Sequence, residues 1–108
     1  MTLIVKRFDS YKIKYMSYKH RDITKVFAAI SCYDGNQIVG ALWFVDTYPI
    51  RHKNSYEKDI IKIHYHTSHF KDIVDTLRYE KPLKLQFDTD KVEGSVATSD
   101  FEPVGELE

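Results

Sequence analysis

The fold is decided by residues 60–82, which read IIKIHYHTSHFKDIVDTLRYEKP. Between Ile61 and Tyr65, apolar residues alternate with polar ones, and this period of two indicates a strand with one buried face. The apolar spacing then changes to i, i+3, i+4 and i+7, which is one stripe of an amphipathic helix, at Phe70, Ile73, Val74 and Leu77. The stretch therefore predicts a strand that leads directly into a helix near residues 69–80.

The ends of this helix carry their own signals. Ser68 is the expected N-cap, because its hydroxyl can accept a hydrogen bond from a backbone N–H of the first turn. Asp72 suits the positive start of a helix, and Arg78 suits the negative end. Pro82 cannot continue a helix and is expected to stop it.

Four strands are expected before this stretch, at residues 3–8, 11–18, 25–33 and 37–48. The first two flank Asp9 and Ser10, a pair that predicts a two-residue turn and hence an N-terminal hairpin. Asp34-Gly35 between apolar runs is a strong hairpin signal, since both residues tolerate the positive φ of a tight turn. Residues 38–45 are apolar on both faces and predict a central strand, in which Gly40 indicates a bulge or a close backbone approach.

A final hairpin is expected from residues 83–87 and 94–99, joined through a turn that begins at Asp88, while residues 49–59 are expected to form a loop. The order of elements predicts an α+β fold. It comprises a mainly antiparallel sheet of about seven strands, flat or strongly bent, with the helix packed on one face. Residues 1–99 are expected to form a single domain, and residues 100–108 an acidic, frayed tail.

Composition restricts the classes of protein that need considering. The 108 residues are 43% hydrophobic and 30% charged, which is typical of one globular domain. Cys32 is the only cysteine, so an internal disulfide is excluded, and its apolar surroundings predict a small buried side chain. The longest apolar run is far shorter than a membrane span, which predicts a cytoplasmic protein with no membrane partner. Residues 1–25 carry a local excess of Lys and Arg, and residues 80–108 an excess of Asp and Glu. The two ends are expected either to attract each other within the fold or to favour head-to-tail contacts between copies.

His64, His66 and His69 are the first candidate site. Three imidazoles this close together could bind zinc or copper and leave a position open for water. The spacing partly resembles the metallo-β-lactamase motif, but Ser68 stands where that motif has aspartate and no histidine follows His69, so that family is excluded. The alternative is that the histidines lie on the wet face of a strand and cap the helix.

The N-terminal hairpin is the second candidate site, because basic and aromatic residues are interleaved along it. Such a surface can neutralise phosphates and stack single-stranded bases. The candidate residues are Lys12, Lys14, Tyr15, Tyr18, Lys19 and Arg21. The alternative is that lysines on an edge strand simply discourage aggregation.

Neither a glycine-rich phosphate loop nor a nucleophile motif is present in the sequence. The leading hypothesis is therefore a small, non-catalytic protein-binding domain whose partner is another protein or a second copy of the chain. The alternatives are a metal-binding protein or hydrolase that uses the three histidines, and a domain that binds single-stranded nucleic acid.

Overall fold

The computed structural model describes residues 2–17, 26–46, 50, 53–80 and 83–98. The elements in chain order are β1 (Leu3–Phe8), β2 (Ser10–Tyr15), β3 (Val26–Asp34), β4 (Gln37–Val45), β5 (Ser55–Glu57), β6 (Ile60–His66), η1 (Thr67–His69), α1 (Phe70–Tyr79), β7 (Leu83–Asp88) and β8 (Glu93–Thr98). This order confirms the α+β class, with mostly antiparallel strands and one short helix. The described residues contain eight strands rather than about seven, because β5 lies in the segment predicted as a loop.

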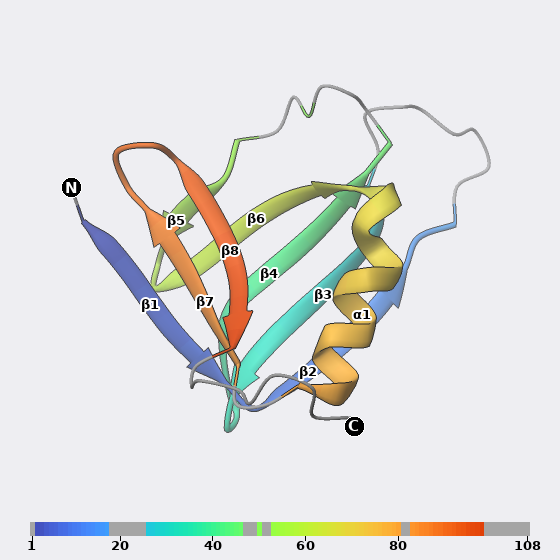
Figure 1. The fold of residues 1–108 in the computed structure, drawn as a ribbon, viewed down its shortest axis with the longest axis horizontal. Coiled ribbons are helices and arrows are strands. Elements are labelled where there is room, and N and C mark those ends of the chain that lie inside the picture. Colours follow the sequence, from blue (N-terminus) through green and yellow to red (C-terminus); the bar gives the residue numbers. More distant parts are fainter. Residues whose placement is uncertain (1, 18–25, 47–49, 51–52, 81–82, 99–108) are drawn as a thin grey trace, which may run out of the picture.

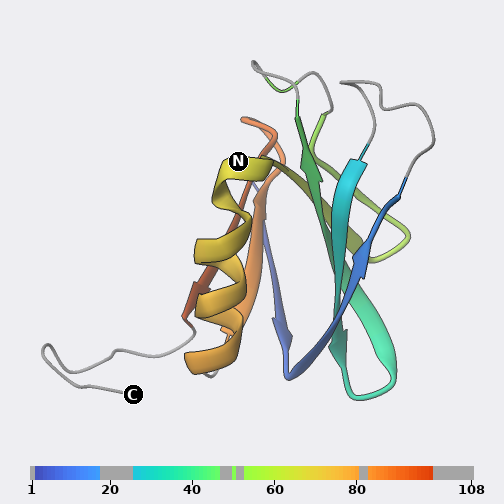
Figure 2. The same cartoon turned by 90° about the vertical axis from the view of Figure 1, so that its right-hand side faces the viewer.

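The strands form two sheets instead of one. The large sheet has the order β2-β3-β4-β6-β5, and the small sheet has the order β1-β7-β8. Figure 2 shows the two sheets diverging like the arms of a V, with α1 beside the small sheet on the same side of the large sheet. Every strand pair is antiparallel except β4 and β6, which run parallel. The strand that separates these two in the chain, β5, lies at the edge of the sheet and pairs antiparallel with β6 (Figure 1).

The predicted N-terminal hairpin is wrong, because β1 pairs with β7 whereas β2 pairs with β3. The chain passes from the small sheet to the large one at Asp9, and three contacts hold it there. The Asp9 N–H donates to the carbonyl oxygen of Tyr33 at 2.9 Å. The Asp9 carboxylate oxygens lie 3.3 and 3.4 Å from the N–H of Gly35, in the turn after β3. Asp9 therefore fixes a corner between the sheets, where the pattern had suggested a tight turn within one sheet.

The core lies between the two sheets, and β4 is its central strand, as its unbroken apolar run predicts. Leu42 and Phe44 are fully buried, and so is Leu85 of the facing small sheet. Gly40 lies beneath Leu85, so closely that a Cβ at this position would overlap the leucine side chain. The predicted close approach at Gly40 is confirmed, and the ladder between β3 and β4 also shifts register beside it, between Cys32 and Tyr33.

The helix packs on the large sheet through the predicted stripe, since Val74 and Leu77 are buried in the core cluster. The Phe70 ring meets the Phe44 ring edge-on, with their centroids 4.9 Å apart. The expected N-cap at Ser68 is wrong, because a 3-10 turn precedes the helix and takes Ser68 into it. His66 caps that turn instead, with its Nδ1 accepting the Ser68 N–H at 3.1 Å.

Candidate functional site

The three histidines of the first candidate site are directed to different places. His64 and His66 point to the outer face of β6, because they alternate with Tyr65, which packs against the core. The His69 ring instead lies beside Tyr65, with a centroid separation of 6.3 Å. His66 Nδ1 is engaged by Ser68, whose hydroxyl oxygen is 2.9 Å away.

Within the residues that the structure describes, no three His, Cys, Asp or Glu side chains are grouped so as to hold a metal ion. The structure thus gives His66 a capping role and places the His69 ring against Tyr65. The zinc or copper hypothesis for His64, His66 and His69 stays a prediction, which a metal titration followed by amide NMR would test.

The candidate nucleic-acid residues are also divided by the strand period. Lys12 and Lys14 point to the outer face of the large sheet, where Lys12 Nζ lies 5.4 Å from the centroid of the Tyr33 ring. Tyr15 lies on the opposite face, with its ring 5.5 Å from the Phe70 ring. Tyr18, Lys19 and Arg21 are outside the described residues. Tyr15 therefore does not share a surface with the two lysines, and nucleic-acid binding stays a prediction that salt-dependent affinity for an oligonucleotide would test.

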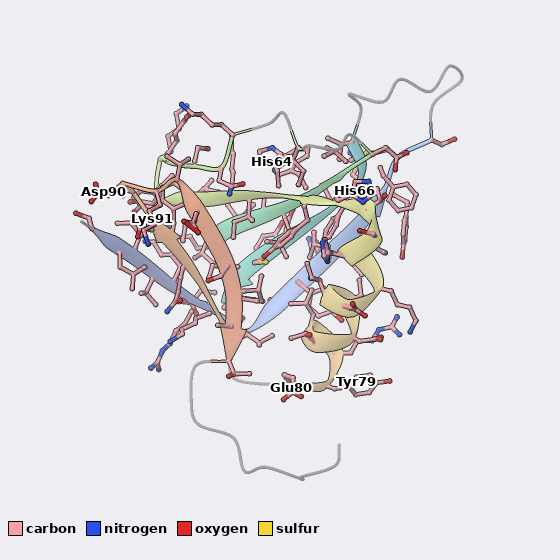
Figure 3. All side chains as sticks on the ribbon, turned by 45° about the horizontal axis from the view of Figure 1, so that its top comes forward. His64, His66, Tyr79, Glu80, Asp90 and Lys91 are labelled. Atoms are coloured by element: carbon pink, nitrogen blue, oxygen red, sulfur yellow. The ribbon has the colours of Figure 1, made fainter. Side chains whose placement is uncertain are left out.

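A groove that the sequence patterns did not reveal lies at the other end of the molecule. It has a volume of about 810 Å³ and separates the C-terminal end of α1 from the corner between β1 and β2. Five of the described lining residues are apolar or aromatic, and four of them, from four elements, make up the floor: Phe8, Tyr11, Leu77 and Leu83. Figure 3 shows Tyr79 and Glu80, which border this groove, far from His64 and His66.

The walls of the groove are held by backbone contacts. One wall is the corner at Asp9, whose bonds to the turn after β3 were described above. The other wall is the end of α1, where the Glu80 N–H donates to the carbonyl oxygen of Thr76 at 3.0 Å. Glu80 itself is extended, so the chain leaves the helix at this point. Both walls are therefore held in place by hydrogen bonds within the protein.

The rim of the groove combines an exposed aromatic ring with charge of both signs. Tyr79 is 60% exposed, because it falls outside the buried helical stripe. Arg78 is exposed beside it, and the carboxylates of Asp9 and Glu80 complete the charged part of the rim. This arrangement suits an amphipathic ligand that has an apolar part for the floor and polar flanks for the rim.

The described groove lining holds neither histidine nor cysteine. The one thiol, Cys32, is fully buried in the core, where desolvation raises its pKa from 9.0 to about 12 and keeps it protonated at neutral pH. Its predicted role as a small buried side chain is confirmed.

Sequence reasoning missed the groove because each floor residue is also a normal core residue of its own element. Phe8 is the last residue of a strand, and Leu77 is the last residue of the helical stripe. Neither pattern predicts that the residue lines a groove at the surface. The one available signal was Tyr79, a large aromatic residue placed off the buried stripe at the end of the helix.

No protein-family model, curated protein or solved structure matches this chain. Among the residues that the structure describes, no helix has the length and apolar character needed to cross a bilayer.

Proposed function

We propose that this protein is a non-catalytic interaction domain that binds a segment of a partner protein in the groove at the end of α1. The observation that carries the proposal is the groove itself, with an apolar floor at the meeting point of four elements. An apolar side chain of the partner would be desolvated on this floor, and burial of such side chains dominates the affinity of protein interfaces.

The rim favours a protein segment over a small, fully enclosed ligand. Tyrosine and arginine are enriched among the residues that contribute most to protein interfaces, and Tyr79 and Arg78 stand side by side here. Arg78 offers a partner carboxylate a paired, two-bond contact. The groove is bordered by exposed residues of α1 and by the exposed Ser10 of the corner, so its described borders are open to a partner chain.

Peptides selected from a phage-displayed random library on the immobilised, tag-free protein provide the test. Their affinity is then measured by fluorescence anisotropy for three variants. Tyr79→Ala removes the exposed ring at the rim, and Arg78→Ala removes the guanidinium that also lines the groove. Tyr15→Ala is the matched control, because Tyr15 is 63% exposed and Tyr79 60% exposed, and Tyr15 does not line the groove.

We expect both groove variants to weaken binding about tenfold or more, and the control to change it less than about twofold, as is usual for a residue outside the contact. Amide shifts on peptide addition should be largest for the residues around Phe8 and Leu77. Selected peptides that bind all three variants equally well, or whose shifts lie elsewhere, would overturn the assignment of the groove as the binding site. Circular dichroism of each variant shows that a loss of binding is not a loss of fold.

A further inference from the structure

The outer edge of β1 is an unpaired strand edge with apolar side chains on it. Figure 1 shows β1 at the margin of the molecule, and the described part of the chain pairs it with β7 alone. Leu3 is 50% exposed and Val5 is 46% exposed. An unpaired edge that carries exposed apolar residues is a template for another strand.

The hydrogen-bond pattern identifies which backbone groups face outward. The carbonyl oxygen of Thr2 accepts the N–H of Thr89 at 3.0 Å, so Thr2 faces the strand that pairs with β1. Backbone direction alternates along an antiparallel strand, and Ile4, Lys6 and Phe8 must therefore bond to β7. The N–H and C=O groups of Leu3, Val5 and Arg7 are directed to the free edge.

The other sheet edges are less available than this one. The side chain of Tyr65 lies beside Val96 of β8, and β5 is only three residues long. The remaining edge strand, β2, carries Lys12 and Lys14, which repel a like strand. Among the strands that the structure describes, β1 thus combines a six-residue length with exposed apolar side chains.

We propose that β1 is a self-association edge, where it pairs antiparallel with β1 of a second copy about a two-fold axis at Val5. This register sets Val5 opposite Val5 of the second copy and Leu3 opposite its Arg7. The outward backbone groups belong to these same three residues, so each pair can exchange both N–H···O bonds. Like charges are not opposite one another, because Lys6 faces Ile4 of the second copy.

Lys6 would normally oppose such pairing, since an inward-pointing charge protects a strand edge. Here the Lys6 Nζ lies 5.9 Å from the centroid of the Tyr56 ring on β5. That cation–π contact directs the charge across to the large sheet and away from the free edge. The small sheet then extends through the two-fold axis into one sheet shared by both copies.

The contact is a single pair of strands and buries less than the roughly 800 Å² per partner of a standard stable interface. We therefore expect a dimer that forms at about 1 mM and dissociates at about 10 µM. Sedimentation velocity of the tag-free protein across this range measures it. Neither the groove nor its partner enters this inference, so it stands or falls independently of the proposed function.

Cysteine cross-linking tests the register. The Cα atoms of Val5 and its symmetry mate should be about 5.5 Å apart, within the range that a disulfide spans. Leu3 and its mate should be about 14 Å apart, because four residues separate them along the paired strands. Val5→Cys and Leu3→Cys are thus matched variants of similar exposure on one strand, and the buried Cys32 does not compete.

We expect Val5→Cys to form a covalent dimer under mild oxidation at least about tenfold faster than Leu3→Cys, since only the first pair meets the disulfide distance. Val5→Pro should abolish the reversible dimer, because it removes an N–H that is directed to the free edge. If the proline variant does not fold, Val5→Lys replaces it in the test, since it places two lysines directly opposite each other in the dimer. A wild-type monomer at every concentration, equal cross-linking of the two cysteine variants, or a dimer that survives both Val5 substitutions would overturn the proposal.

Discussion

A close approach of the two sheets, at Gly40, makes the packing of the core testable quantitatively. A Cβ at this position would overlap the Leu85 side chain and lie 3.1 Å from the carbonyl oxygen of Ile61. Leu85 is fully buried, so its side chain can move aside only by displacing neighbouring core side chains. Overpacking of a core costs about 1–3 kcal/mol, and loss of the glycine's freedom in the unfolded chain returns about 0.4–1 kcal/mol. Gly40→Ala should therefore lower the free energy of unfolding by about 1–2 kcal/mol.

The leucine side of the contact supplies a double-mutant cycle. Leu85→Ala removes the overlapping methyl group and leaves a cavity, at a cost of about 2–5 kcal/mol. In the double variant, the new methyl group at position 40 occupies part of that cavity. The combined loss should therefore be smaller than the sum of the two single losses by about 0.5–2 kcal/mol.

Urea unfolding at 25 °C, followed by far-UV circular dichroism, measures all four proteins of the cycle. Gly40→Ala combined with Tyr79→Ala is the control pair, because Tyr79 is exposed at the end of α1 and should add independently. A neutral or stabilising Gly40→Ala, or an additive Gly40→Ala/Leu85→Ala pair, would refute the close approach of the small sheet over β4.

Three further predictions concern the helix, its cap and the buried thiol. Leu77→Ala should lower the free energy of unfolding by about 2–4 kcal/mol, because Leu77 is buried in the core cluster; a urea-measured loss below half a kcal/mol would contradict the assigned helix face. His66→Ala should cost about 0.5–1 kcal/mol through loss of the cap at Ser68. His69→Ala, which removes no capping bond, should cost less, and equal costs would contradict the capping role. Burial raises the Cys32 pKa to about 12 in the fold, so unfolding releases a proton above pH 9. The contribution of Cys32 to stability should therefore be constant below that pH and fall as the pH rises toward 12. The stability of the wild type should fall more steeply over this range than that of Cys32→Ala, and equal slopes for the two proteins would contradict the prediction.

Features set by local spacing could be predicted from the sequence. The helical stripe and the apolar run around Gly40 each depend on residues within one element, and the structure has both where the spacing places them. The Asp88 turn is equally local, since the Asp88 carboxylate accepts the N–H groups of Asp90 and Lys91 at 2.9 and 3.1 Å. Patterns of this kind report which face of an element is buried, and they do so without knowledge of its neighbours.

Strand partners could not be predicted, because pairing joins residues that are far apart in the chain. Leu3 lies opposite Asp88, and alternation in β1 is compatible with a partner in any strand of suitable polarity. Asp9 shows how the error arose. A short polar residue between two strands is typical of a hairpin turn, but its hydrogen bonds to Tyr33 and Gly35 divide the strands between two sheets. The groove depends on the same corner and was hidden for the same reason.

The groove and the β1 edge share one strand but use opposite sides of it. Phe8 lines the groove with an inward side chain, whereas Val5 and Leu3 point outward, so each surface can be altered without changing the other. A dimer through β1 would carry two grooves, and a partner with two binding segments would then gain affinity through a high effective concentration. Val5→Lys should therefore leave the affinity for a soluble single peptide unchanged, and it should shorten retention on a surface densely coated with that peptide. Equal retention of Val5→Lys and wild type on the dense surface would show that the two surfaces do not cooperate, and a weakened affinity for the soluble peptide would show that they are not separate.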